Sequence, residues 1–203
     1  MSTVKQEKYL GVLISDDLSW APHISNVVTT ASQRLGFLAR NLRGSPSDLK
    51  RTAYISMVRS TLEYAAIVWD PYQANQTAAL ERVQRKSARW IKGDYKRLSS
   101  VTTMMESLRL EPLDQRRRNS RLTFLYKILN DGVALTPDDL DLVRNRRATR
   151  GLATQQKLIV PYCSTDQRKY HFAARTIPEW NRLPEATTSA ESVSVFRARL
   201  TAP

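Results

Sequence analysis

Two adjacent carboxylates, Asp16 and Asp17, are the first residues of the chain whose chemistry suggests a catalytic role. Paired carboxylates can hold two Mg²⁺ ions roughly 4 Å apart for phosphoryl transfer. A polymerase normally takes a further Asp from a separate strand, and we expect no strand upstream of this pair to supply one. The residues after the pair lead into a helical pattern from Pro22, and acids are favourable near a helix N-terminus. We therefore predict a strand-to-helix turn here and no catalytic residues.

Cysteine and histidine form no further catalytic or metal-binding pattern. Cys163 is the single cysteine, which excludes an internal disulfide and a cysteine-based zinc site. His23 lies near a helix start and fits a capping or surface role, whereas His171 lies in the run KYHF and fits a packed or surface role. The sequence has no Gly-rich phosphate loop and no GxSxG or HExxH motif. We predict no enzymatic activity for this chain, no metal site and no cofactor.

Residues 77–97 suggest a different chemistry, the binding of phosphate. Read at about 100° per residue, they predict a helix with an apolar stripe on one side and cations on the other. Cations three or four residues apart repel by a few tenths of a kcal/mol per pair, and Glu81 can relieve only Arg85. Such a helix docks by its apolar face and presents its cations to an anion, although a solvated charged face is an equally good interpretation of this helix alone.

The two faces consist of these residues. The apolar stripe is formed by Leu80, Val83, Ser87, Trp90 and Ile91. The predicted nucleic-acid-binding residues on the opposite face are Arg82, Arg85, Lys86, Arg89 and Lys92.

Further basic clusters strengthen the phosphate interpretation. The formal net charge is +13, and clusters recur at residues 116–121, 144–150 and 168–169. In the first of these clusters the predicted contacts are Arg116, Arg117, Arg118 and Arg121. Because phosphate contacts carry no sequence information, we predict salt-dependent, sequence-nonspecific binding of RNA or DNA. Each cluster taken singly is also consistent with a solvated face or loop.

The sequence predicts no membrane span, because no stretch approaches about 18 consecutive apolar residues. The N-terminus also lacks the apolar core of a signal peptide. We therefore expect an intracellular location, with nucleus and cytoplasm both open.

The hydrophobic pattern predicts a mainly α fold. A β-strand remnant at residues 8–15 is expected to need a partner, and no earlier segment looks long enough to provide one, so the chain is expected to begin within a sheet. Helices are predicted over residues 22–42, 45–69, 77–92, 99–108 and 112–129, with Ser45 as the N-cap of the second. Short links between them imply an antiparallel helical bundle. A small irregular α+β C-terminal part should follow, with a strand at 156–161 and helices within 169–183 and 192–200.

These elements suggest four parts. Residues 1–20 would be a strand region, 21–132 a helical bundle, 133–155 a basic flexible loop and 156–203 a C-terminal subdomain.

An ordered set of short motifs resembles the region just after the catalytic core of LINE-type, jockey-like non-LTR retrotransposon reverse transcriptases. The motifs cover about residues 8–200 in family order. They are KYLGV (8–12), LSW (18–20), PHI (22–24), LGFL (35–38), RNL (40–42), LEYA (62–65), VWDPY (68–72), LE (80–81), VQR (83–85), AR (88–89), GDY (93–95), LEPL (110–113), RRR (116–118), RTI (175–177), EWNRLP (179–184) and residues 196–200.

The resemblance implies a position within such an enzyme. Residues 9–12 would match the last strand region of the palm, and the helices from Pro22 would match the thumb, which clasps the template–primer duplex. Residues 1–20 would thus be the end of a palm-like strand region, and residues 21–132 a thumb-like helical bundle. The family's aromatic-x-Asp-Asp catalytic box should precede residue 8 and is not in this sequence. The resemblance thus implies a non-catalytic C-terminal fragment of an RNA-directed DNA polymerase. Mg²⁺ would be needed only by the intact parent, whose palm would be a further partner. The alternative is a helical interaction or folding module with no independent role in nucleic-acid binding.

Overall fold

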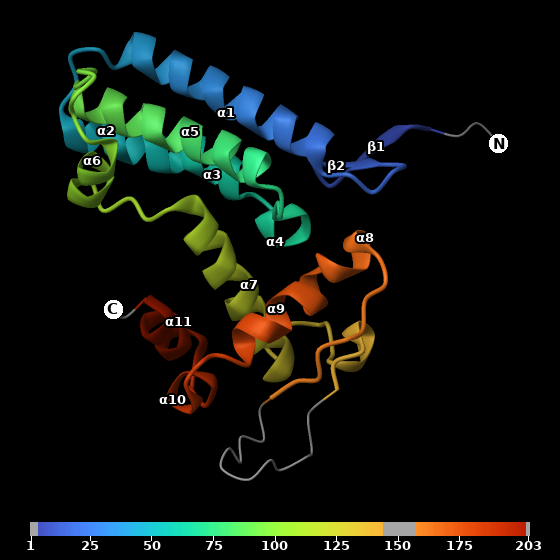
Figure 1. Ribbon diagram of the computed structural model, residues 1–203. Coiled ribbons are helices and arrows are strands. Elements are labelled where there is room, and N and C mark those ends of the chain that lie inside the picture. The colour runs from blue at the N-terminus through green and yellow to red at the C-terminus, as the bar shows by residue number, and fades with distance from the viewer. Residues whose placement is uncertain (1–3, 144–156, 202–203) are drawn as a thin grey trace. The chain divides into compact units, whose positions relative to one another are not determined.

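The computed structural model describes residues 4–143 and 157–201. It divides into two compact units, Met1–Arg117 and Arg118–Pro203, and the boundary falls inside the helix α7 (Leu113–Leu129) (Figure 1). Within the described residues the fold is mainly helical, which confirms the predicted fold class. The predicted four-part division remains a prediction. The two units are described separately below as unit 1 and unit 2.

Unit 1 begins with a β-hairpin. Strands β1 (Gln6–Tyr9) and β2 (Val12–Ser15) pair antiparallel, with Tyr9 opposite Val12. Between them Leu10 (φ 45°) and Gly11 (φ 85°) both adopt the left-handed conformation that tight hairpin turns require. The prediction of a single strand without a partner is therefore wrong. Gly11 allows the chain to reverse in the middle of the apolar run, and the polar residues before it supply the second strand.

Three helical segments form the bundle of unit 1. In Figure 1, α1 and α5 lie side by side and run in one direction, while the segment from α2 to α3 packs along them in the opposite direction, so the predicted helical bundle is confirmed. Tyr54, Leu62 and Leu80 are fully buried in its core. The segments are α1 (Ala21–Asn41), then α2 (Ser47–Ala53) continuing through the π-helical turn Tyr54–Arg59 into α3 (Ser60–Glu63), and α5 (Ala74–Lys92).

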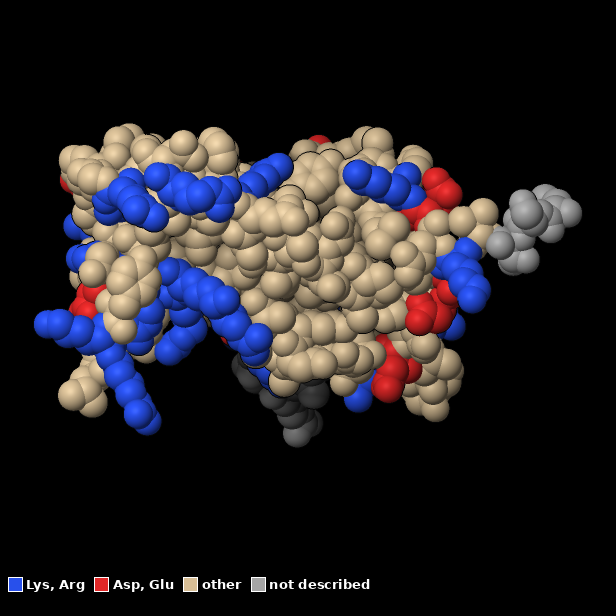
Figure 2. Space-filling view, turned by 90° about the horizontal axis from the view of Figure 1, so that it is seen from above, with Lys and Arg blue, Asp and Glu red and all other residues tan. Residues whose placement is uncertain are grey.

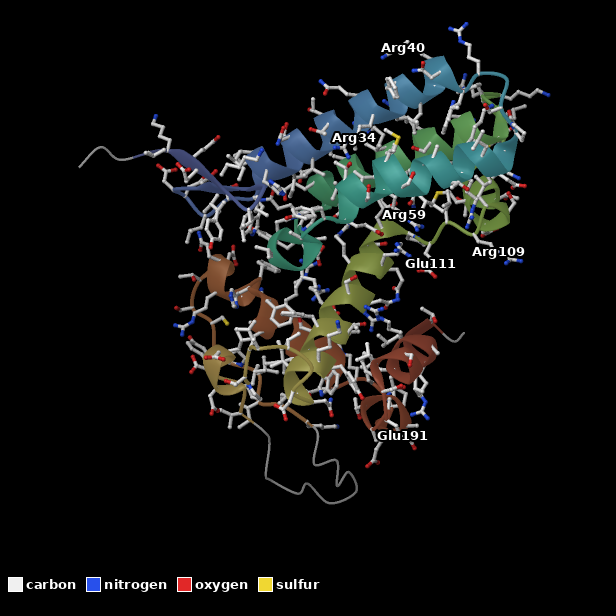
Figure 3. The ribbon with its side chains drawn as sticks, turned by 180° about the vertical axis from the view of Figure 1, so that it is seen from behind. Arg34, Arg40, Arg59, Arg109, Glu111 and Glu191 are labelled. Carbon is white, nitrogen blue, oxygen red and sulfur yellow. The ribbon has the colours of Figure 1, made fainter. Side chains whose placement is uncertain are left out.

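The π-helical turn is tied to α1 by an arginine. Arg34 donates hydrogen bonds from Nη1 to the Met57 carbonyl (3.1 Å) and to Thr61 Oγ1 (2.5 Å), and Figure 3 shows Arg34 between the two helices. A π-helical turn holds one more residue than an α-helical turn, so it changes which side of the helix the following residues occupy. The turn therefore sets the orientation of α3 in the bundle.

The second helix differs from its prediction at both ends. It starts at Ser47 with Pro46 before it, so the predicted N-cap at Ser45 is wrong, although Asp48 does lie in the first turn. It ends at Glu63 rather than near residue 69, because Ala65 adopts a left-handed conformation (φ 51°). The short helix α4 (Ala66–Trp69) then follows. It is held in place by the buried Trp69, whose Nε1 donates to the Tyr64 carbonyl at 2.9 Å.

The later helices of unit 1 follow the sequence pattern closely. α6 (Val101–Ser107) is capped by Ser100, whose hydroxyl accepts a hydrogen bond from the N–H of Thr103. α7 begins at Leu113, directly after Pro112, as predicted. Both boundaries arise from local signals, a capping serine and a proline at the helix start.

Unit 2 packs around Phe196. The Phe196 ring stacks on Tyr126 (centroids 4.5 Å apart) and on Trp180 (5.8 Å). Of the predicted strand at 156–161, the described residues form only an isolated β-bridge at Leu158. The Ile159 N–H donates to the Val143 carbonyl (2.8 Å), and the Leu158 backbone bonds to the side-chain amide of Asn181 at 3.0 and 2.8 Å. The predicted helices within 169–183 and 192–200 are confirmed. The elements after α7 are a 3₁₀ turn (Asp138–Leu140), α8 (Asp166–Lys169), α9 (Phe172–Trp180), α10 (Glu185–Thr188) and α11 (Val193–Thr201).

Candidate nucleic-acid interface

The apolar face of α5 is buried as predicted. All five stripe residues, Leu80, Val83, Ser87, Trp90 and Ile91, lie in the core, where α5 packs against α1, α2 and α6. Gly93 ends the helix in a left-handed conformation (φ 66°), which a glycine adopts without steric cost. The helix is therefore fixed in rotation, and its opposite face is presented to solvent.

Four of the five predicted cations on α5 lie exposed on that opposite face. They are Arg82, Arg85, Lys86 and Lys92. Figure 2 shows Lys and Arg side chains that stand out from the surface of the protein. No acidic residue lies between Arg82 and Lys92 in the sequence, so no acid on this stretch of the helix offsets these cations.

Glu81, the acid that precedes these cations, points into unit 1 instead. Its Oε1 accepts a hydrogen bond from the backbone N–H of Asp114 (3.0 Å) in the first turn of α7. Burial raises the pKa of Glu81 above its ordinary value, and the hydrogen bonds from this helix start oppose the rise only in part. The acid thus caps α7 and leaves the cationic face of α5 largely unneutralised.

Arg89, the fifth predicted cation on α5, is engaged within the protein. Its guanidinium donates to three backbone carbonyls in the loop that follows the helix, those of Asp94 (3.4 Å), Lys96 (3.0 Å) and Ser99 (3.3 Å). Arg89 is therefore a structural residue of this loop, with Nη1 and Nη2 both bonded to its carbonyls.

The first two arginines of α7 form ion pairs inside unit 1. Arg116 pairs with Glu63 through two hydrogen bonds, one of them 3.1 Å long, and lies 3.6 Å from Glu111. Arg117 bonds Asp70 at 2.7 Å, with side chains only 1% and 6% exposed. A phosphate could reach Arg117 only by displacing a buried carboxylate.

The other two predicted arginines of α7 form ion pairs inside unit 2. Arg118 Nε lies 3.4 Å from a carboxylate oxygen of Glu179. Arg121 is buried, donates to both oxygens of Glu179 (3.1 and 3.2 Å) and contacts the Thr176 hydroxyl at 3.4 Å. The run of arginines is thus neutralised by Glu63, Asp70 and Glu179.

A periodic pattern in the sequence distinguishes the buried arginines of α7 from the exposed arginines of α5. Leu113, Arg117, Arg121 and Leu125 recur every four residues, and all four are buried. Arg117 and Arg121 therefore occupy the apolar stripe of their helix, where a charge needs an internal partner. The cations of α5 lie off its stripe.

The prediction also missed two exposed cations, Lys96 and Arg97, which follow α5 in the loop held by Arg89. Helical periodicity, from which the cations of α5 were predicted, cannot indicate these two residues because they lie beyond the end of the helix. Together with the four exposed cations of α5 they form what we name the α5 surface: Arg82, Arg85, Lys86, Lys92, Lys96 and Arg97.

The other residues considered for catalysis or metal binding have the following contacts and exposure. Asp17 accepts a hydrogen bond from the N–H of Ser19 (2.9 Å) just before α1, so the predicted strand-to-helix turn is confirmed. His23 is buried, its Nδ1 accepts from the Leu13 N–H (3.1 Å), and burial lowers its pKa. His171 is exposed at the start of α9, and the Cys163 thiol contacts the Pro161 carbonyl at 3.5 Å.

Metal and membrane features were searched over the described ranges 4–143 and 157–201. No three His, Cys, Asp or Glu side chains there gather in a way that would hold a metal ion. No helix in those ranges is both long and apolar enough to cross a membrane. The predicted basic cluster at residues 144–150 lies outside the described residues.

Comparisons with protein-family models, with curated proteins and with solved structures find no match to this chain.

Proposed function

We propose that this chain is a non-catalytic C-terminal part of a non-LTR retrotransposon reverse transcriptase and binds the template–primer nucleic acid through phosphate contacts at the α5 surface. The observation that carries the proposal is the rotation of α5. Its apolar stripe is buried, while Arg82, Arg85 and Lys86 are exposed with no acid among them. A fixed row of cations on a helix is suited to a polyanion of regular spacing.

The dimensions of the surface fit a nucleic-acid backbone. Arg82 and Lys92 are ten residues apart, which is about 15 Å along a helix axis. A duplex advances about 3.4 Å per base pair, so the row spans roughly four base-pair steps. Several cations can therefore contact successive phosphates without any change in the helix.

The resemblance supplies the biological context of the proposal. In the intact parent, the palm would carry the Mg²⁺-dependent polymerisation, and this chain would contribute duplex binding. The motifs named above include residues that pair with one another, such as Glu63 with Arg116 and Asp70 with Arg117. Their joint presence supports the idea that the motifs of unit 1 belong to one fold.

A second candidate function is a helical interaction or folding module with no role in nucleic-acid binding. It is favoured by the fate of five predicted cations, Arg89, Arg116, Arg117, Arg118 and Arg121, which bond within the protein. Under this alternative the exposed cations of α5 would serve solubility alone.

Binding to a fluorescein-labelled RNA–DNA duplex, measured by anisotropy over a range of salt concentrations, tests the two candidates. The wild-type logarithm of the association constant should fall linearly with the logarithm of salt concentration. Removing one cation that contacts a phosphate should reduce that slope by about 0.9. The triple variant Arg82→Gln/Arg85→Gln/Lys86→Gln should therefore have a slope smaller by between two and three units and bind at least tenfold more weakly.

A matched control removes the same charge elsewhere in unit 1. The variant Lys5→Gln/Lys8→Gln/Arg43→Gln changes three exposed cations that lie outside the α5 surface. It should retain most of the wild-type slope. Equal reductions in both triple variants would show that net charge alone attracts the duplex, and absence of binding by the wild type would favour the second candidate.

A further inference from the structure

The loop after α5 exposes two apolar side chains among cations. Leu98 is 99% exposed and Tyr95 is 67% exposed, although both are large and apolar. Lys96 and Arg97 lie between them in the sequence, and Lys92 is the last residue of α5, directly before Gly93 and the loop. Single exposed apolar residues are common on protein surfaces, but an exposed aromatic ring flanked by cations is a recognised arrangement for binding nucleotides.

The loop is held in one conformation by hydrogen bonds to its backbone. Arg89 donates to the carbonyls of Asp94, Lys96 and Ser99, at 3.4, 3.0 and 3.3 Å. The Asp94 carboxylate accepts from the Lys96 N–H (3.0 Å), and the Ser99 N–H donates to the Lys96 carbonyl (3.2 Å) in a turn with Arg97 and Leu98 at its tip. Tyr95 and Leu98 are therefore presented to solvent from an ordered backbone.

The charges of the loop select an anionic partner over a neutral apolar one. Its cations, Lys96 and Arg97, are exposed, whereas its single acid, Asp94, is bonded back to the loop. The pKa of Asp94 lies below its ordinary value because its carboxylate accepts hydrogen bonds from Ser99 and Lys96. The loop also continues the cationic row of α5 directly.

We propose that residues 94–98 bind an unpaired nucleotide at a junction between duplex and single strand, with Tyr95 stacking on the base, Leu98 packing at its edge, and Lys96 and Arg97 contacting its phosphates. The inference rests on the proposed function, because the α5 surface would bind the adjoining duplex. It adds a preference for nucleic acid with an unpaired base, which phosphate contacts alone cannot produce. Stacking on Tyr95 requires a base that is not paired and stacked within the duplex.

Two probes that share one duplex test the inference, one with blunt ends and one with a short single-stranded overhang. The overhang probe should bind the wild type about tenfold more tightly than the blunt probe, as expected for one stacked base. Tyr95→Ser should bring the two affinities within about twofold of each other and leave blunt-duplex binding unchanged, whereas Tyr95→Phe should keep the preference. A 2-aminopurine in the overhang should lose fluorescence on binding the wild type but not Tyr95→Ser.

A control variant and the opposing results complete the test. Tyr162→Ser removes a tyrosine of unit 2 that is more exposed (90%) than Tyr95 and should retain the preference. Equal affinity of the wild type for both probes, or an unchanged preference in Tyr95→Ser, would overturn the inference while leaving the proposed duplex binding intact. Failure of the wild type to bind either probe would overturn both.

Discussion

Helices α5 and α7 carry similar runs of basic residues with opposite structural fates. The cations of α5 lie off its apolar stripe, and Arg82, Arg85 and Lys86 remain exposed. In α7, Arg117 and Arg121 occupy the stripe itself and are buried. The contrast shows that the position of basic residues around the helix, relative to its apolar stripe, decides whether they are exposed or buried.

The physical reason is the cost of removing a charge from water. A buried guanidinium without a partner loses several kcal/mol of solvation free energy, so it must pair with a carboxylate that is buried with it. Arg117 and Asp70 meet this requirement at 2.7 Å, and Arg121 and Glu179 meet it at 3.1 Å. An exposed cation such as Arg85 keeps its solvation and needs no internal partner.

The largest difference between the helices should appear in stability. Arg117→Ala leaves the buried carboxylate of Asp70 without its main partner, so the free energy of unfolding should fall by about 3–5 kcal/mol. Arg85→Ala should change it by less than about 0.5 kcal/mol. Urea denaturation followed by tryptophan fluorescence measures both. Decreases of similar size in the free energy of unfolding of the two variants would contradict the distinction between a buried arginine in α7 and an exposed one in α5.

Arg89 is the intermediate case, because it lies on α5 but bonds to three carbonyls. Arg89→Gln should lower the free energy of unfolding by about 1–2 kcal/mol, less than a buried ion pair and more than an exposed cation. Amide hydrogen exchange at Lys96 and Ser99 should accelerate, since the backbone of their loop loses its anchor. Arg85→Gln serves as the control and should leave this exchange unchanged; unaltered exchange in Arg89→Gln would contradict the anchoring role.

The smallest expected effect is a change in the pH dependence of stability when Glu81 is replaced, and its sign distinguishes two roles of this residue. Because burial raises its pKa, the folded chain holds this proton to higher pH than the unfolded chain. The resulting stabilisation is fully present below the ordinary pKa and is lost as pH rises through the folded value. Glu81→Gln keeps an acceptor oxygen for the N–H of Asp114 and cannot ionise, so its stability relative to the wild type should rise from acid to neutral pH.

The sign of that change tests whether Glu81 serves α7 or its own helix. A carboxylate paired mainly with Arg85 would have a lowered pKa and would stabilise the fold more at neutral pH. The relative stability of Glu81→Gln would then fall with rising pH. Thermal unfolding of the wild type and of Glu81→Gln at matched pH values measures the difference in stability. The contributions of the other titrating groups cancel in this difference, because both proteins contain them.

Helices were predictable where local signals and periodicity agree. α1, α5 and α6 follow from apolar residues at spacings of three and four, from the glycine at position 93 and from the capping Ser100. The hairpin and the break at Ala65 were not predictable in this way. Both depend on single residues in left-handed conformations, and for Leu10 and Ala65 nothing in the side chain favours that conformation.

The candidate site was only partly predictable for a related reason. The exposed row on α5 follows directly from its helical phase, but the role of Arg89 depends on where the following loop places its carbonyls. Likewise Glu63 and Asp70 are about fifty residues from the arginines with which they pair. Such long-range partners cannot be assigned from spacing within one helix.

The π-helical turn Tyr54–Arg59 has a consequence for how this chain can vary in length. Because the turn holds one residue more than an α-helical turn, deleting one residue there would restore α-helix and leave the residues after it in their present phase. Leu62 would stay in the core and Glu63 would stay beside Arg116, whereas a deletion that the turn does not take up would rotate both by about 100°. Related chains that differ by one residue between Ser47 and Glu63 should therefore have the alignment gap at the π-helical turn.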